Sequence, residues 1–153
     1  MAWAFVSART EPSIRARAMR FLARREHSRA ELRRKLAPRA QASEDLEALL
    51  DDLEKRGWLS DARYAEQSIR SHSRRFGPLK LALLLRSRGV DDETIAAAFR
   101  AAGEAGVSSL EAVWRRRFHA PPADEHDRAR QVRFLQGRGF GLDDIIKFLR
   151  ADR

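Results

Sequence analysis

The chain has 153 residues, of which 43% are hydrophobic and 35% charged, a balance that suits one small folded domain or a short array of smaller units and excludes a disordered tail. It contains no cysteine, which excludes disulfides and thiol chemistry, and no run of eighteen apolar residues that would span a membrane. Lys and Arg outnumber Asp and Glu by 31 to 22, so the net charge of +9, carried mostly by arginine, predicts a partner with negative charge.

The N-terminal stretch, residues 1–12, is expected to form a flexible leader. Its opening, "MAWAFVSA", is apolar but lacks the basic start and the length of an export signal. Together with the absence of cysteine, this predicts a cytoplasmic protein.

Beyond the leader, several stretches place apolar residues on one face of a helix, at the spacing i, i+3, i+4 and i+7 or close to it. In chain order they are Ile14, Ala18, Phe21 and Leu22, then Leu46, Leu49, Leu50 and Leu53, and then Leu110, Val113, Trp114 and Phe118. No stretch alternates convincingly between apolar and polar residues, as a strand would. The sequence therefore predicts an all-α protein.

Helix starts are indicated by residues that satisfy free backbone groups. Ser28 and Ser108 each stand three residues before a glutamate, the spacing of a capping box. Pro78 occupies a place that the first turn of a helix accepts. The paired prolines Pro121 and Pro122 cannot continue a helix and predict a loop over 118–127.

Helix ends are indicated by three glycines, in "KRGW", "SRGV" and "GRGF". A glycine adopts the left-handed conformation that closes a helix, and the next residue then packs back on that helix. The pattern predicts helix ends at Gly57, Gly89 and Gly139, with Trp58, Val90 and Phe140 as the packing residues.

One pattern of residues is written three times along the chain. Leu85, Arg88, Ile95 and Phe99 recur fifty residues later as Leu135, Arg138, Ile145 and Leu149, and forty-nine residues earlier as Leu36, Arg39, Leu46 and Leu50. Such a period is typical of stacked helical units that share apolar surface with their neighbours. We predict three tandem three-helix repeats, at residues 13–58, 59–107 and 108–153.

Charge alternates in phase with this repeat. Residues 13–39, 68–90 and 113–140 carry net charges of +8, +6 and +4, whereas residues 40–67 and 91–112 carry −5 and −4. Acids at helix starts favour the positive end of the helix dipole, and a basic run is commonly a solvated face. Three basic runs in phase with a structural repeat favour a single basic surface along the array.

The candidate binding residues are the arginines of these basic runs, because a guanidinium forms two parallel bonds with a phosphate or a carboxylate. They are Arg17, Arg20, Arg24, Arg25, Arg33, Arg34, Arg74, Arg75, Arg86, Arg88, Arg115, Arg116, Arg130 and Arg133.

Four segments, "REHSRAELRRKL", "LEKRGWLSDARYAE", "RFGPLKLALLLRSRGV" and "RFLQGRGFGLDDI", resemble the successive blocks of the RecX regulatory proteins over residues 13–150. The resemblance implies an extended, curved array that binds along the groove of the RecA filament. It implies inhibition of filament extension, ATPase, strand exchange and coprotease activity, contact with single-stranded or filament-bound DNA, and no active site or cofactor.

Six residues match the motifs of that family, and each reads as a helix cap or a packing residue: Gly57, Leu59, Asp61, Tyr64, Gly139 and Phe140. The chain departs from the pattern in the first unit, where Ala40 stands in place of Gly89 and Gly139 of the later units.

Two other classes of function compete with this interpretation. A non-sequence-specific DNA-binding helical protein acting without RecA would carry the same net charge, although no recognition helix or aromatic single-strand platform is evident. An enzyme or metal protein would need a site, and the only cluster is "HAPPADEH", where Asp124 and Glu125 lie between His119 and His126. It lacks the rigid spacing of metal ligands. We therefore predict that the protein binds no metal and is not an enzyme. We also expect it to be a monomer.

Overall fold

The computed structural model describes residues 10–106 and 110–151, and these form helices and loops without a strand. The first unit contains α1 (Ile14–Arg24), α2 (Arg29–Leu36) and α3 (Leu46–Lys55). The second contains α4 (Asp61–His72), α5 (Pro78–Ser87) and α6 (Asp92–Gly106). The third contains α7 (Leu110–Arg115), α8 (Glu125–Gly137) and α9 (Leu142–Ala151). The predicted all-α array of three tandem three-helix units is confirmed.

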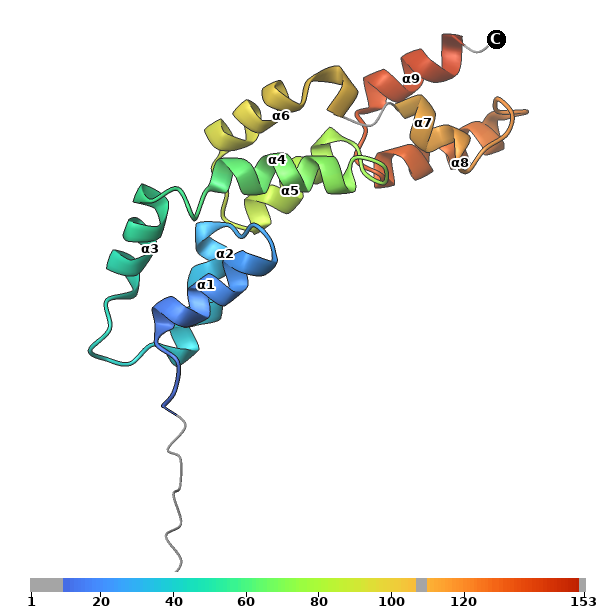
Figure 1. The fold of residues 1–153 in the computed structure, drawn as a ribbon. Helices are drawn as coiled ribbons and strands as arrows, with labels where there is room; N and C mark the ends of the chain where they lie inside the picture. Colours follow the sequence, from blue (N-terminus) through green and yellow to red (C-terminus); the bar gives the residue numbers. More distant parts are fainter. Residues whose placement is uncertain (1–9, 107–109, 152–153) are drawn as a thin grey trace, which may run out of the picture.

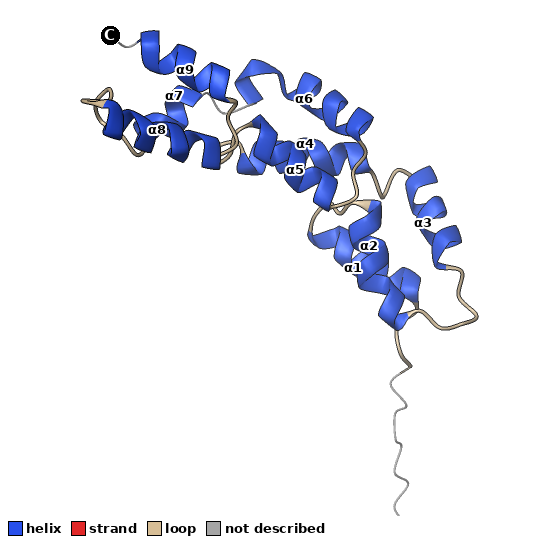
Figure 2. Ribbon diagram, turned by 180° about the vertical axis from the view of Figure 1, so that it is seen from behind, coloured by secondary structure: helices blue, strands red, loops and turns tan. Residues whose placement is uncertain are grey.

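The three units follow one another in an elongated, bent array (Figures 1 and 2). The third helices of the units, α3, α6 and α9, lie along the outer edge of the bend, and α2, α5 and α8 lie nearer its inner edge. No helix in the described part of the chain combines the length and the apolarity needed to cross a membrane. Most of the predicted leader, residues 1–9, lies outside the described residues.

Each unit has its own apolar core, built from the predicted helix faces. The first core contains Leu32, Leu36, Leu50, Leu53 and Leu59, the second Ile69, Leu81, Leu85 and Ile95, and the third Trp114, Leu135, Ile145 and Leu149. The repeated leucines Leu36, Leu85 and Leu135 are all buried. The period of the sequence is therefore the period of core packing, whereas the exact limits of the units stay a prediction.

The three predicted helix ends form as expected, with positive φ at Gly57, Gly89 and Gly139. In each case the following amide donates to the carbonyl of a core leucine five residues earlier, for example Val90 to Leu85 at 3.1 Å. The expectation for Trp58 is wrong, because this side chain is 44% exposed and lies against the guanidinium of Arg56. Leu59, 2% exposed, enters the core instead.

Helix starts agree in part with the sequence. Ser28 accepts a hydrogen bond from the amide of Glu31 at 3.1 Å, but the Glu31 carboxylate bonds to Arg25 rather than completing a capping box. Pro78 is the first residue of α5, and the Ser108 cap lies outside the described residues. The loop predicted to reach Asp127 ends earlier, because Asp124 caps α8 by accepting from the Asp127 amide at 2.7 Å.

The first unit ends its second helix differently from the later units. A short 3-10 turn, Ala37–Arg39, follows α2, and Ala40 is extended, with a φ of −76°. Alanine avoids the left-handed conformation that Gly89 and Gly139 adopt, so the chain leaves this helix by another route.

Adjacent units are joined end to end through their second helices. At the first junction the Ser28 hydroxyl donates to the Arg88 carbonyl at 2.6 Å, so the end of α5 meets the start of α2. At the second junction the amides of Gly77 and Leu79 donate to the carbonyls of Arg138 and Gly139, at 2.6 and 3.0 Å. The free carbonyls at each helix end thus satisfy free donors at the next helix start, with dipoles aligned favourably.

Candidate partner-binding surface

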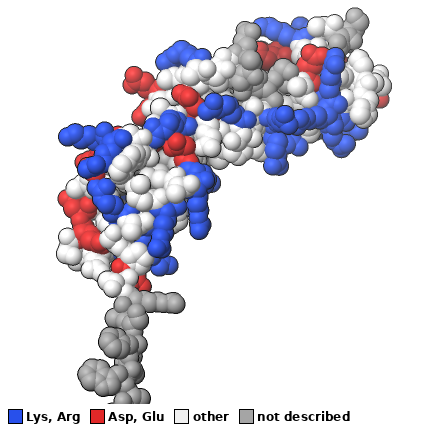
Figure 3. Space-filling view, viewed as in Figure 1, with Lys and Arg blue, Asp and Glu red and all other residues white. Residues whose placement is uncertain are grey.

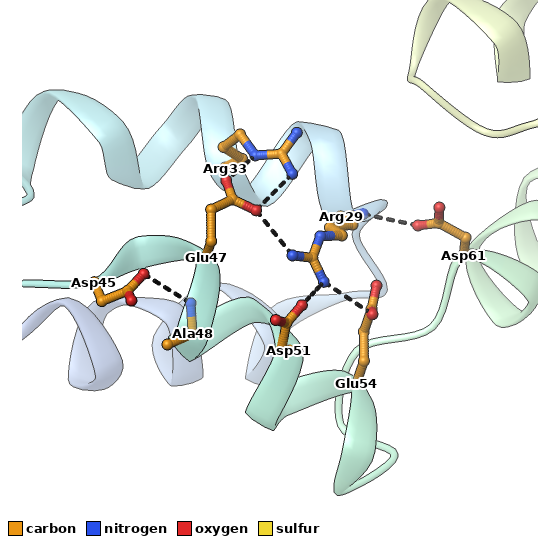
Figure 4. Close-up of polar contacts among 8 residues, drawn as sticks. All are labelled: Arg29, Arg33, Asp45, Glu47, Ala48, Asp51, Glu54 and Asp61. Atoms are coloured by element: carbon orange, nitrogen blue, oxygen red, sulfur yellow. Dashed lines mark hydrogen bonds and ion pairs between the residues drawn. The ribbon is translucent and has the colours of Figure 1, made fainter.

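Many basic residues of the first unit are neutralised inside the unit. The Arg29 guanidinium lies 2.9, 2.6 and 2.9 Å from the carboxylates of Glu47, Asp51 and Glu54 on α3, and Arg33 bonds to Glu47 at 2.6 Å (Figure 4). These hydrogen bonds, from Arg33 first and then Arg29, lower the pKa of Glu47 to about 2. The acidic face of α3 therefore balances the side of α2 that it faces.

The predicted binding arginines divide into two groups, according to whether they form an ion pair within the protein. Six form ion pairs: Arg17 with Glu11, Arg25 with Glu31, Arg33 with Glu47, Arg86 with Asp92, Arg115 with Glu111, and Arg130 with Asp127. The other eight form no ion pair within the described residues: Arg20, Arg24, Arg34, Arg74, Arg75, Arg88, Arg116 and Arg133. A guanidinium without an internal carboxylate keeps its bonding capacity for a partner.

Two of these unpaired arginines lie in a basic hollow of about 280 Å³ on the first unit. Among the described residues no carboxylate lines this first hollow, whose walls are Arg17, Arg20, Phe21, Arg24, Lys35 and Arg39. The candidates named from the sequence do not include Lys35 or Arg39. Arg39 could have been found, because it is the repeat equivalent of Arg88 and Arg138.

A buried histidine supports one wall of the first hollow. His27 is 1% exposed, its Nδ1 donates to the Arg25 carbonyl at 3.0 Å, and its Nε2 accepts from the Lys35 ammonium at 3.0 Å. Burial lowers the pKa of His27 from its ordinary value of 6.5, against the bond to the Arg25 carbonyl, and nearby Arg25 and Lys35 lower it further. The ring is therefore neutral, as its bond from Lys35 requires.

We expect the free energy of unfolding to fall as the pH drops below 6.5. The unfolded chain binds a proton at His27 more readily than the folded chain does. The contribution of neutral His27 to the free energy of unfolding is therefore complete above pH 6.5 and is lost as the pH falls toward the lowered pKa of the folded state. Denaturant titrations at pH 7.5 and 5.5 measure this loss, with His27→Gln as the control that removes it. An equal loss in the His27→Gln variant would assign the pH dependence to another group.

A second basic hollow, of about 230 Å³, lies between the second and third units. Arg74 and Arg75 follow α4, Arg116 and Arg117 follow α7, and Arg138 ends α8. The remaining walls are Val113 and Phe134, so no carboxylate from residues 10–106 or 110–151 lines this hollow.

Contacts between the loops hold the second hollow together. Arg116 donates to the Arg74 carbonyl at 3.0 Å, and the Arg138 guanidinium lies 5.1 Å from the centre of the Phe134 ring. Arg117 and Arg138 are not among the predicted binding residues, because only the fold brings these two loops together. Five arginines thus line one concavity whose positive charge suits a phosphate or carboxylate group.

The distribution of charge over one face of the molecule is uneven (Figure 3). Basic side chains gather on the inner side of the first unit and along the underside of the third, and a further group lies at the outer edge where α3 ends. Acidic side chains gather on the outer side of the first unit, where α3 lies. An anionic partner is therefore attracted to the inner side.

The residues that match the family motifs hold helix ends and junctions. Gly57 closes α3, Leu59 and Phe140 are buried, and the Asp61 carboxylate accepts from the Arg29 amide at 2.8 Å. Two further motif residues lie at the boundaries between units. They are Tyr64, in a polar hollow that also includes Arg25 and Arg88, and Gly139, against Lys80.

The cluster that could suggest a metal site serves the start of α8 instead. Asp124 caps the helix, and Asp127 bonds to Arg130. Residues 10–106 and 110–151 contain no group of three or more His, Asp or Glu side chains placed to hold a metal ion.

Comparison with known proteins supplies the family. Three family models match in tandem: RecX, first three-helix domain (residues 15–53), RecX, second three-helix domain (60–98), and RecX, third three-helix domain (105–149). The regulatory protein RecX of Leptothrix cholodnii is 44% identical over 94% of this chain and 92% of its own. That of Ralstonia nicotianae is 45% identical over 91% and 87%.

A solved structure agrees with the fold. The crystal structure of RecX from Lactobacillus salivarius superposes with a TM-score of 0.72 at 20% identity, covering 90% of this chain and 95% of that one. Three matching domains in the expected order, close relatives over nearly the full length and this shared fold lead to one conclusion: the chain belongs to the RecX family of regulatory proteins.

Proposed function

We propose that this protein is a negative regulator of the RecA recombinase. It binds along the groove of the RecA nucleoprotein filament through its basic inner side and inhibits filament extension, ATPase, strand exchange and coprotease activity. It acts as a cytoplasmic monomer, without a cofactor and without catalysis. The observation that carries the proposal is the gathering of unpaired arginines in two hollows of a bent array that belongs to a regulatory family.

The physical basis is electrostatic attraction combined with steric obstruction. A RecA filament presents a polyanionic strand and acidic protein surface, and arginines bind both phosphate and carboxylate through paired hydrogen bonds. Because second helices meet end to end at both junctions, the hollows are held apart at a set spacing. An elongated body seated in a groove blocks the motion of protomers and the approach of a second strand.

The test is the single-strand-dependent ATPase of the cognate RecA filament, titrated with this protein at two salt concentrations. Direct binding to the bare strand is measured beside it. We expect half-inhibition at protein concentrations well below those that coat the bare strand.

The competing function is DNA binding without RecA. In that case inhibition sets in only once the strand is coated, and both effects weaken in parallel as salt rises, because displaced counterions govern affinity for nucleic acid. That result would reject the filament as the target. The basic hollows would attract the bare strand and the RecA filament alike. The comparison of the two titrations therefore decides which of them is the target.

A further inference from the structure

Two leucines of α5 are the most exposed large apolar side chains in the described part of the chain. Leu79 is 61% exposed and Leu83 is 64% exposed. They are four residues apart and therefore lie on the same side of the helix. Together with Lys80, Gln136, Gly137 and Gly139 they line a hollow of about 310 Å³ at the boundary with the third unit. We call Leu79 and Leu83 the leucine pair.

The leucine pair is not part of the core of its own unit. The second core is supplied from α5 by Leu81 and Leu85, which are both 1% exposed. Isolated exposed leucines are ordinary, but two on adjacent turns beside a concavity are typical of a surface that a partner covers.

The charge around the leucine pair indicates the chemistry of that partner. Lys80 forms one wall of the hollow, and no carboxylate in the part of the chain that the structure describes lines it. The Lys80 ammonium donates to the Gly137 carbonyl at 3.2 Å and lies 4.5 Å from the centre of the Phe76 ring. An ammonium with one internal acceptor retains two donors for a carboxylate.

The leucine pair also adjoins the second basic hollow. The guanidinium of Arg75, a residue of that hollow, lies 5.5 Å from the same Phe76 ring that Lys80 covers. A ligand in the hollow and a ligand on the leucines are therefore neighbours. A nucleic-acid backbone satisfies the arginines but offers the leucines nothing apolar, whereas a protein surface supplies both kinds of contact.

We propose that the leucine pair docks onto the protein subunits of the filament. The occupant is a surface segment that presents an aliphatic side chain to Leu79 and Leu83 and a carboxylate to Lys80. This inference rests on the proposed function and refines it: the leucine pair contacts protein, whereas the basic hollows bind phosphate or carboxylate groups of the filament. Inhibition then requires both, which gives preference for the filament over bare strand.

The test is the double variant L79Q/L83Q. Glutamine forms helices almost as well as leucine but removes the apolar contact. We expect the concentration for half-inhibition of the filament ATPase to rise about tenfold, the effect of losing two partly buried leucines. Affinity for the bare strand stays within twofold. The tenfold change is the same at both salt concentrations, because an apolar contact is not screened.

The matched control is Leu142→Gln, which alters another exposed leucine, 46% accessible, at the start of α9. It leaves inhibition unchanged. If the double variant unfolds at a lower temperature than the parent, Leu79→Gln alone, in the first turn of α5, is measured in its place, with an expected rise of about threefold.

Each other outcome has a separate meaning. Inhibition equal to that of the parent overturns the docking proposal and leaves the proposed function intact. An equal loss of bare-strand affinity shows that nucleic acid covers the leucines, and a dimeric parent that becomes monomeric in the variant shows that a second copy covers them; both overturn the proposal. A parent protein that inhibits only by coating the strand rejects the proposed function itself.

Discussion

Reversing the charge of Arg74 and Arg75 to glutamate (R74E/R75E) is expected to raise the concentration for half-inhibition of the RecA filament about a hundredfold at low salt. Both side chains line the second basic hollow and have no carboxylate partner in the described residues. Loss of one charge-assisted contact changes affinity roughly tenfold. The measurement is the ATPase titration, repeated at higher salt, where screening narrows the difference.

The R74E/R75E variant is expected to remain folded. The contact that ties this loop to the third unit runs from Arg116 to the Arg74 backbone carbonyl, which the substitution leaves in place. Thermal unfolding therefore changes little. Unchanged inhibition by the folded variant would remove the second basic hollow from the proposed mechanism.

A variant of equal charge separates a local effect from a general one. R100E/R150E alters two exposed arginines on α6 and α9, the helices along the outer edge of the bend. Each substitution changes the charge by two, so both double variants carry a net charge of +5 instead of +9. We expect R100E/R150E to inhibit within about threefold of the parent, because its sites lie away from the hollows.

Replacing Gly139 by alanine is expected to lower the free energy of unfolding by about 2–5 kcal/mol. The φ of +95° at this glycine disfavours any side chain, which accounts for roughly 1–2 kcal/mol. A Cβ would also lie 2.4 Å from the Lys80 Cβ and 2.6 Å from the Lys80 backbone nitrogen. Relieving that overlap means displacing the start of α5, at a further cost of about 1–3 kcal/mol. Urea unfolding measures the total.

The chain contains its own control for this prediction. Gly57 closes α3 with the same motif and a similar φ of +74°, but a Cβ there would have no atom within 4 Å. Gly57→Ala is therefore expected to cost only the backbone term, about 1–2 kcal/mol. Equal losses in the two variants would mean that the second and third units do not pack as closely as the structure shows.

Helix positions and helix ends could be predicted from the sequence because they depend on neighbours within a few residues. The 3.6-residue period places Leu49, Leu50 and Leu53 on one face of α3 wherever that face packs. The glycine at position 57 ends the helix because only the backbone conformation of that residue is involved. Trp58 was predicted wrongly because the same local motif can direct either of two following residues into the core.

Only the tertiary structure decided which arginines remain free of an internal carboxylate and can therefore bind a partner. Arg33 and Arg34 are neighbours in one basic run, yet only Arg33 meets a carboxylate, on a helix fourteen residues away. Arg117 and Arg138 join Arg74 in one hollow because two loops from different units converge.

The sequence by itself thus determined the helices, their faces and the repeat of the units, since these follow from the short-range geometry of the backbone. Which charges cancel and which remain for a partner depends on distances between elements far apart in the chain. Coulomb interactions fall off with separation in space, regardless of separation in sequence. The packing of α3 against α2 and of the third unit against the second therefore selects the basic surface from a larger set of arginines.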